Sequence, residues 1–335
     1  MQRELPEEPG LFEPLADMLA GFMRTQALSV AAELGVADVV STVPMEVDEI
    51  ADRVGAERSA LYRLLRFLAS EGVFAEVEPR SFVATPLSGA LRSDQARSVH
   101  WLAIWRGSEL YRCWADATHA IRTGEPVFER VYGRTFFEYM TEHPERGAVF
   151  DRAMAEKTRE RLAALVSYDW AVAERVADIG GGNGTAIATV LRAAPHLHGV
   201  LFDLPTVVES ADAVLEKAGV RERCEIIGGD FFGDPLPTAD ILILSQVLHD
   251  WNDDRAAAIL ANCRRAVHDG GRLLLVEGVI PEGPDPDFIK LLDLCMLLLF
   301  GSKERTEDDW RALLANARFR LTRRLPTGLI EARPA

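Results

Sequence analysis

Residues 178–184 are the segment of this sequence best suited to holding a nucleoside. They read Asp-Ile-Gly-Gly-Gly-Asn-Gly and lie where a predicted apolar strand at 175–179 passes into a predicted helix at 185–192. Glycine lets a backbone approach a ligand closely, and doubly wound folds bind nucleosides where the first strand ends. We therefore expect a cofactor to contact Gly180 and Gly182.

Acidic residues follow the next two predicted strands. Asp203 lies in a Phe-Asp-Leu-Pro segment at 202–205, where its carboxylate could accept both hydroxyl protons of a ribose. Asp230 lies in a Gly-Asp-Phe-Phe segment at 229–232, where it could hold an adenine amino group with Phe231 beside the ring. Many turns contain a glycine cluster, but the three features together indicate a cofactor that contains adenosine.

The same residues favour S-adenosylmethionine over NAD. The dinucleotide pattern G-x-G-x-x-G would need glycine at position 185 or 187, and the residues there are Thr185 and Ile187. Asp178 would also be unfavourable beside a pyrophosphate. S-adenosylmethionine contains no phosphate and carries an ammonium and a sulfonium group, so an acidic rim attracts it.

His249 follows the predicted fourth strand at 241–244 and could act as a base. Methyl transfer from a sulfonium to oxygen is an in-line displacement, and a neutral hydroxyl is a poor nucleophile. Histidine has an unperturbed pKa of about 6.5 and can take such a proton near neutral pH, which accelerates a reaction roughly 100- to 10,000-fold. The alternative is an ordinary histidine at the start of a helix. His196 and His198 lack an acid or cysteine at ligand spacing, so we expect no metal site.

Together, these segments resemble the small-molecule O-methyltransferases of the caffeate and flavonoid type and the bacterial relatives that tailor aromatic antibiotics. The resemblance covers nearly the whole chain, and its specific marks are the segments at 178–182, 202–205, 229–232, 248–251 and 301–306. It implies an enzyme that uses S-adenosylmethionine, releases S-adenosylhomocysteine and methylates a hydroxyl of a small aromatic molecule. The family also includes relatives that keep the cofactor but catalyse decarboxylation or hydroxylation.

The resemblance also implies roles for individual residues. His249 matches the general base, and Glu277 and Glu304 match two acids that flank it, which favours methyl transfer over the other reactions. The expected cofactor contacts are Gly180, Gly182, Asp203, Leu204, Asp230, Phe231, Ser245 and Met154. The expected acceptor contacts are Phe150, Asp250, Met296 and Phe300. Ser245 and Gln246 replace a basic residue of the plant enzymes, so contacts on the adenine side are expected to differ.

The N-terminal part, residues 1–95, is predicted to be a mainly helical winged-helix domain. Apolar residues recur at helical spacing from position 15 to 23, a second helix is expected from an N-cap at Ser59 to Gly72, and a hairpin is expected at 73–77 and 81–84. Arg58, Arg63 and Arg66 could touch DNA phosphates, which leaves a ligand-sensing regulator as an alternative. The net charge of -15 favours dimerisation instead.

The remainder is predicted to be a helical linker at 96–170 that contributes large apolar side chains to the acceptor pocket, followed by a catalytic domain at 171–335. Continuous apolar strands alternate with helices in this last part, which is typical of a parallel α/β sheet covered on both faces. Two further strands, at 319–322 and 328–332, are expected to complete a Rossmann-like methyltransferase sheet.

Composition indicates a cytoplasmic protein. Residues 1–8 are acidic and lack an apolar export segment, the apolar run at 291–300 is too short to span a membrane, and no two of the four cysteines form a C-x-x-C pair. We expect the thiols to be reduced and buried. Basic residues are mostly arginine, which fits a GC-rich bacterial genome and a role in secondary metabolism. The expected partners are the aromatic substrate and a second copy of the chain, without nucleic acid or membrane.

Overall fold

A computed structural model of the chain describes residues 12–95, 97–325 and 328–335, apart from the side chains of 155–161. The acidic stretch at 1–8, where we expect no export signal, lies outside the described residues. The chain divides into two compact units. The first comprises Met1–Ala115 and Phe137–Glu156, and the second comprises Asp116–Phe136 and Lys157–Ala335. Each unit is therefore built from two separate stretches, whereas the predicted boundaries at 95 and 170 divide the chain into consecutive parts.

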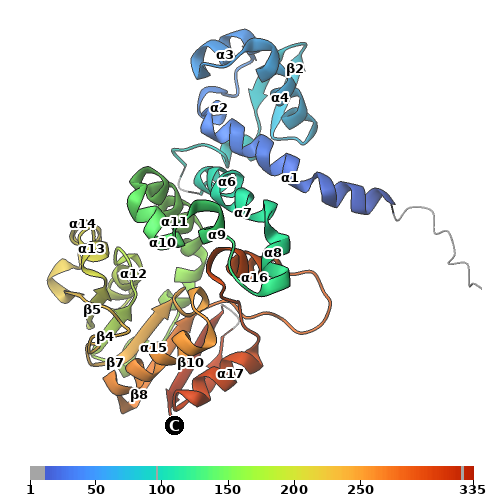
Figure 1. Cartoon of the computed structure of the whole chain (residues 1–335). Coiled ribbons are helices and arrows are strands. Elements are labelled where there is room, and N and C mark those ends of the chain that lie inside the picture. Colours follow the sequence, from blue (N-terminus) through green and yellow to red (C-terminus); the bar gives the residue numbers. More distant parts are fainter. Residues whose placement is uncertain (1–11, 96, 326–327) are drawn as a thin grey trace, which may run out of the picture. The chain divides into compact units, whose positions relative to one another are not determined.

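The first unit contains the expected helices and hairpin (Figure 1). Its strands form an antiparallel sheet in the order β1-β3-β2. The N-cap of α4 is Glu57 and not Ser59, because the Glu57 carboxylate accepts hydrogen bonds from the backbone of Ser59 and Ala60 at 3.0 and 2.7 Å. The elements of this unit are α1 Phe12–Glu33, α2 Val36–Val39, β1 Met45–Glu46, α3 Val47–Val54, α4 Arg58–Ser70, β2 Phe74–Glu78, β3 Ser81–Ala84, α5 Pro86–Gly89, α6 His100–Gly107 and α7 Glu109–Ala115.

Helix α1 keeps a long apolar face outside the core of this unit. The core consists of residues such as Ile50, Leu65 and Phe82, which are fully buried. The following apolar residues of α1 are each 52–80% exposed: Phe12, Leu15, Met18, Leu19, Phe22 and Met23. Such a large contiguous apolar surface is typical of a protein–protein interface.

The second unit contains a seven-stranded sheet in the order β6-β5-β4-β7-β8-β10-β9. The first five strands are mutually parallel, while β10 pairs antiparallel to both β8 and β9. The predicted mostly parallel sheet is confirmed. Its strands are β4 Arg175–Ile179, β5 His198–Asp203, β6 Cys224–Gly228, β7 Ala239–Ser245, β8 Val267–Val276, β9 Phe319–Arg324 and β10 Leu329–Pro334.

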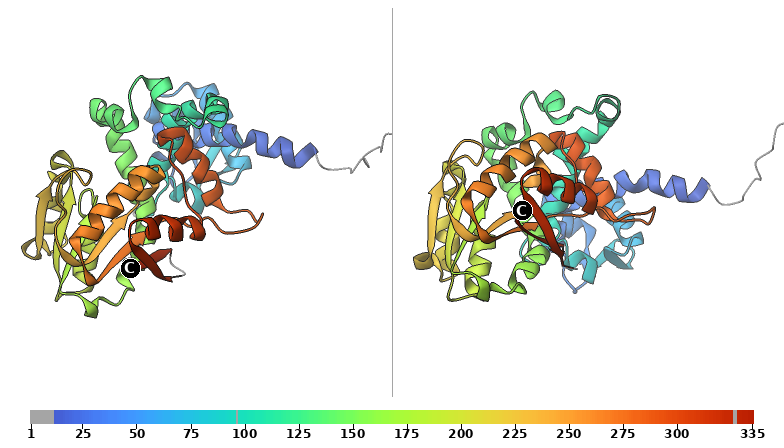
Figure 2. Two further views of the ribbon diagram at one scale, coloured as in Figure 1. Left: turned by 60° about the horizontal axis from the view of Figure 1, so that its bottom comes forward. Right: turned by 90° about the horizontal axis from the view of Figure 1, so that it is seen from below.

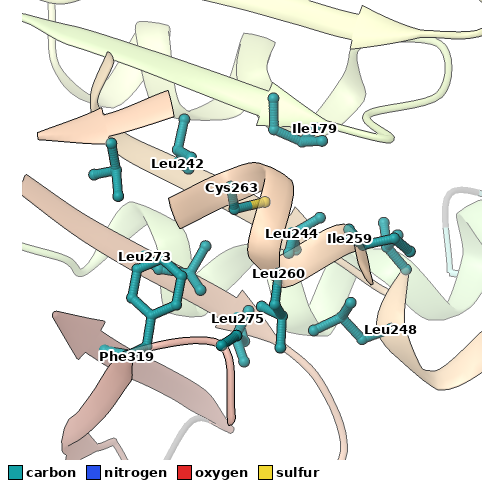
Figure 3. Packing of buried hydrophobic residues seen from close by; sticks show 14 of the residues in the cluster. Ile179, Leu242, Leu244, Leu248, Ile259, Leu260, Cys263, Leu273, Leu275 and Phe319 are labelled. Atoms are coloured by element: carbon teal, nitrogen blue, oxygen red, sulfur yellow. The ribbon is translucent and has the colours of Figure 1, made fainter. Parts of the chain in front are cut away.

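Helices cover both faces of this sheet (Figure 2). Alternate residues of a strand point to opposite faces, so Leu242 and Leu244 of β7 pack with α15 and α17, while Ile241 and Ile243 pack with α12 and α14. Figure 3 shows the first of these layers, where Leu260 and Cys263 of α15 lie over the apolar side chains of the strands. These helices are α12 Thr185–Ala193, α14 Ala211–Lys217, α15 Asp253–Ala266 and α17 Glu307–Asn316.

Further helices lie beside the catalytic sheet or link the two units. Helices α8 and α9 contact α16, and the backbone N–H of Val127 donates to the carbonyl of Leu298 at 2.9 Å. The remaining elements are α8 Ala117–Thr123, α9 Phe128–Tyr132, α10 Phe136–Glu142, α11 Pro144–Val166, η1 Trp170–Val172, α13 Pro205–Val208, η2 Arg221–Arg223, η3 Leu248–Asp250 and α16 Phe288–Phe300. All four cysteines are free and buried, as predicted. Within the described ranges, no helix is both long and apolar enough to cross a membrane.

Replacing Leu260 by alanine tests the layer between α15 and the sheet. Leu260 is 0% exposed, so Leu260→Ala should lower the free energy of unfolding by about 2–5 kcal/mol through lost burial and the cavity left behind. Val172→Ala removes an apolar side chain that is 47% exposed and should change stability by less than about 0.5 kcal/mol. Urea unfolding measures both variants, and equal midpoints would contradict this packing.

Candidate active site

The glycine-rich turn presents bare backbone at the carboxyl end of β4. Gly180, Gly182 and Gly184 have φ angles of 70°, 60° and 81°, a region that side chains with a Cβ rarely adopt. A Cβ on Gly180 would lie 2.9 Å from Val247 and 3.5 Å from Phe231, whereas no described atom lies within 4 Å of a Cβ position on Gly182. The turn therefore leaves open space beside Gly182. At position 180 any larger residue would come too close to Val247.

Asp203, at the end of β5, is tied to this turn. Its Oδ2 accepts a hydrogen bond from the Gly182 backbone N–H at 2.8 Å, and its Oδ1 accepts one from Leu204 at 2.7 Å. Burial raises the pKa of Asp203, although both backbone donors oppose that effect. Each carboxylate oxygen retains capacity for a second donor, so two ribose hydroxyls fit the arrangement.

Phe231 lies beside the turn, as its proposed contact with adenine requires. Asn262 on α15 holds its backbone by donating to the Phe231 carbonyl at 2.9 Å. Asp230 is exposed, and its Oδ1 accepts a hydrogen bond from the backbone of Phe232 at 2.9 Å. The segment after β6 thus brings one carboxylate and one aromatic ring to the same edge of the sheet as Gly180.

Asp178 is a fully buried acid beneath the turn. Its side chain is 0% exposed, and neither of its oxygens has a hydrogen-bond partner among the described residues. Burial, and then the charge of Asp203, raises its pKa to about 7. A buried carboxyl group without a counterion is costly, and a bound cation would offset that cost. This fits the ammonium and sulfonium of S-adenosylmethionine and disfavours a pyrophosphate.

His249 lies in the short helix η3, between β7 and α15. The ring is 8% exposed, and its Nδ1 lies 2.9 Å from Oε1 of Glu304. Since a carboxylate accepts hydrogen bonds, Nδ1 donates to Glu304, which leaves Nε2 to take a proton. Nε2 lies 3.4 Å from Oδ1 of Asp250.

Three carboxylates set the charge of this histidine. Burial on its own would lower the pKa of His249, but the charges of Asp250, Glu277 and Glu304 outweigh burial and raise the pKa to about 9. Burial also raises the pKa of Asp250 to about 6 and that of Glu277 to about 7, against the opposing charge of His249. The imidazole is therefore a stronger base than free histidine.

Glu277 holds the turn that leads to His249 and does not bond the ring itself. Its Oε1 accepts from the backbone N–H groups of Val247 and Leu248 at 3.0 and 2.8 Å. Gln246, just before them, has a φ of 57°, an uncommon value that is often associated with functional sites. The two predicted flanking acids thus act differently: Glu304 bonds the imidazole and Glu277 bonds the backbone.

The remaining predicted residues divide between the two units. Met296 is buried on α16, and Phe300 of the same helix meets Phe136 edge to face at 4.9 Å. Phe150 and Met154 lie on α11 in the first unit, where Phe150 contacts Trp105 at 5.1 Å, so their roles stay predictions. Other predicted positions in the second unit are Ser245, which ends β7 opposite Val276, and Leu204, which is 48% exposed.

Sequence reasoning missed a supporting residue on α16. Oδ1 of Asp293 accepts a hydrogen bond from the backbone N–H of Glu304 at 2.8 Å, which fixes the segment that carries the carboxylate bonded to His249. The available signal was a single acid inside the apolar run at 291–300, because a carboxylate there needs a hydrogen-bond donor.

Comparison with known proteins agrees with this geometry. A model of the O-methyltransferase domain family matches residues 114–320, and a model of the O-methyltransferase dimerisation domain matches residues 16–94. The phenazine O-methyltransferase PhzM of Lysobacter antibioticus is 46% identical over 325 residues, which cover 96% of this chain and 95% of that protein.

Solved structures of similar sequence have the same fold. The crystal structure of LaPhzM has a TM-score of 0.91 and 44% identity, and the match covers 99% of this chain and 100% of that chain. The O-methyltransferase NcsB1 from neocarzinostatin biosynthesis, solved with S-adenosylmethionine and 2-hydroxy-5-methyl naphthoic acid, has a TM-score of 0.82 and 33% identity, covering 93% and 96% of the two chains. The present chain therefore belongs to the O-methyltransferase family and is an S-adenosylmethionine-dependent O-methyltransferase with a dimerisation domain.

Proposed function

We propose that this enzyme methylates a phenolic hydroxyl of a small, flat aromatic molecule in bacterial secondary metabolism, with His249 as the general base. The observation that carries this proposal is the 2.9 Å contact between Nδ1 of His249 and Glu304, inside a cluster of carboxylates that raises the pKa of His249 to about 9. When bound, S-adenosylmethionine supplies the electrophilic methyl group. The acceptor hydroxyl supplies the oxygen nucleophile, so the protein must remove the hydroxyl proton.

His249 removes the acceptor proton through Nε2. Glu304 fixes the tautomer, because the Nδ1–H bond to its carboxylate keeps Nε2 available, and it stabilises the imidazolium that forms. Glu277 holds the preceding turn, and Asp250 contacts the acceptor beside Nε2. Gly180, Gly182, Asp203, Leu204, Asp230, Phe231, Ser245 and Met154 hold the cofactor.

The strength of this base favours a phenol over an aliphatic alcohol. A phenolic hydroxyl has a pKa of about 10, so transfer of its proton to an imidazole with a pKa of about 9 is uphill by roughly 1 kcal/mol. An aliphatic hydroxyl resembles water, with a pKa of about 15.7, and the same transfer would cost roughly 9 kcal/mol. The phenazine and naphthoic acid in the names of the relatives are flat aromatic molecules, and α16 carries the buried Met296 and the aromatic Phe300 that we propose to contact such a ring.

Two other functions are less consistent with the site. A relative that decarboxylates or hydroxylates needs no base for a hydroxyl, whereas His249 here keeps its carboxylate partner. A DNA-binding regulator is disfavoured by the net charge of -15, and one of its three candidate arginines on α4, Arg58, is paired with Asp52 at 3.0 Å and lies 3.5 Å from Asp48. The exposed apolar face of α1 supports a homodimer instead, with a second copy of the chain covering it.

The reaction can be tested with methyl-labelled S-adenosylmethionine and two matched acceptor series. We expect label in hydroxylated naphthoates and phenazines and none in aliphatic alcohols of similar size. His249→Ala should reduce turnover roughly 100- to 10,000-fold while the affinity for S-adenosylhomocysteine stays unchanged. His268→Ala, with a side chain that is 58% exposed, is the control. Full turnover by His249→Ala, or no labelled phenol with the wild-type enzyme, would contradict the proposal.

The charge on Glu304 should determine the pH dependence. His249 must be neutral to accept a proton, so the rate should rise with pH as the imidazole loses its proton, and the ring should titrate near pH 9 by NMR in the ligand-free protein. Glu304→Gln removes a negative charge, so the pKa of His249 should fall. The rising limb of the pH–rate profile should then move to lower pH. Glu307→Gln, which removes a carboxylate that pairs with Arg311 and Arg324 and not with His249, should leave the profile in place. An unmoved limb in Glu304→Gln would mean that the two groups do not interact.

Asp203→Asn tests recognition of the cofactor. The amide cannot accept from Gly182, Leu204 and two ribose hydroxyls together, so the affinity for S-adenosylhomocysteine should fall by about 1–3 kcal/mol in calorimetry. Asp285→Asn, in an exposed loop, should bind as the wild type does. NAD should give no binding heat with either variant. If Asp203→Asn bound S-adenosylhomocysteine with wild-type affinity, the Asp203 carboxylate would not be a cofactor contact.

A further inference from the structure

Arg305 carries a buried charge close to the proposed base. Its side chain is 0% exposed, and a buried cation is stable only when its donors are satisfied. Its Nε and Nη2 donate to Oδ1 of Asp253 at 3.0 and 2.9 Å. The guanidinium also packs over the ring of Trp310, 5.1 Å from the ring centre. The charge therefore has one carboxylate partner and a rigid support.

The other contacts of this guanidinium are backbone carbonyls on both sides of His249. Nη1 donates to the carbonyl of Leu248 at 2.8 Å, and Nη2 donates to the carbonyl of Trp251 at 2.9 Å. These two carbonyls bracket His249 and Asp250 in the chain. A planar guanidinium presents its donors in a fixed fork, so binding three acceptors at once fixes where η3 lies.

The neighbours of Arg305 contact the same stretch. Glu304 bonds the imidazole of His249, and Nζ of Lys303 lies 2.7 Å from Oδ2 of Asp253. Residues 303–305 thus contact the segment 248–253 through three side chains. Glu304 bonds the ring of His249, Arg305 bonds two backbone carbonyls and Asp253, and Lys303 pairs with the same Asp253.

We infer that Arg305 is a positioning residue for methyl transfer, whose guanidinium locks the turn 248–251 so that the His249 imidazole stays on Glu304. The inference rests on the proposed role of His249 as the base. Without the fork, the carbonyls of Leu248 and Trp251 lose their buried donors and the turn shifts. Because a displacement of about 1 Å at a reacting group can cost roughly a hundredfold in rate, a small movement of this turn matters.

Arg305→Lys tests the fork while keeping the charge. A lysine ammonium lacks the planar arrangement of donors, so we expect kcat to fall roughly tenfold to a hundredfold, with KM for the acceptor and affinity for S-adenosylhomocysteine within about twofold of the wild type. Lys303→Met is the matched control, because it removes an exposed ion pair to the same Asp253 without touching either carbonyl. Its kcat should stay within about twofold of the wild type.

The pH profile separates positioning from a merely structural role. When the imidazole drifts from Glu304, it loses the interaction that, with the charges of Asp250 and Glu277, raises its pKa. The rising limb of kcat and the NMR titration of His249 should therefore move to lower pH in Arg305→Lys. A variant that only melts earlier, with a wild-type profile and kcat in its folded state, would overturn the inference.

A second variant covers the case in which Arg305→Lys does not fold. Asp253→Asn changes a side chain that is 54% exposed and keeps an oxygen that accepts from the buried guanidinium, so this variant should fold, while the loss of the negative charge weakens the hold on Arg305. We expect a kcat several-fold below that of the wild type and a shift of the rising limb of the pH–rate profile to lower pH. A wild-type kcat and pH profile in Asp253→Asn, while His249→Ala remains inactive, would reject the positioning role of Arg305 and leave the proposed function standing. Full activity of His249→Ala would instead reject the proposed function.

Discussion

The hydrogen bond between His249 and Glu304 is the interaction on which the proposed chemistry of this site depends. It joins residues 55 positions apart in the sequence at 2.9 Å, and both side chains are almost fully buried. In such surroundings an isolated charge is expensive, so the imidazole and its three neighbouring carboxylates are stable only as a group. The neighbouring carboxylates raise the pKa of His249 to about 9. The segments that carry these carboxylates must therefore hold them close to the ring.

Much of this arrangement could be predicted from the sequence because it depends on local patterns. Apolar strands ending in glycine or aspartate identify the edge where the parallel strands β4, β5 and β6 end, and the carboxyl ends of neighbouring parallel strands necessarily meet. Asp203 and Phe231 could be assigned to the neighbourhood of Gly180 for that reason. The same logic located His249 after β7, since this strand is the neighbour of β4 on the other side.

Other features depend on contacts that no local pattern specifies. Glu277 and Glu304 were expected as equivalent flanking acids, yet one bonds backbone and the other bonds the ring, because each leaves its segment in a different direction. The cap at Glu57 replaced the expected Ser59 because a longer side chain one position before the helix reaches two N–H groups. Asp293 and Arg305 were visible as a single acid in an apolar run and a basic residue in a motif, but their partners lie outside those segments, 11 and 57 positions away.

The proposed cofactor contacts and the proposed base lie on two different kinds of structure. The cofactor edge is made of strand ends and bare glycine backbone, where the sheet fixes position and few side chains matter. The proposed base, His249, lies outside the sheet on a short helix. Side chains from other segments hold it there: Glu277 bonds the turn before it, Glu304 bonds the ring, and Asp293 bonds the backbone of Glu304. The turn that carries His249 therefore depends on side chains from segments far apart in the sequence, whereas the cofactor edge depends on the strands themselves.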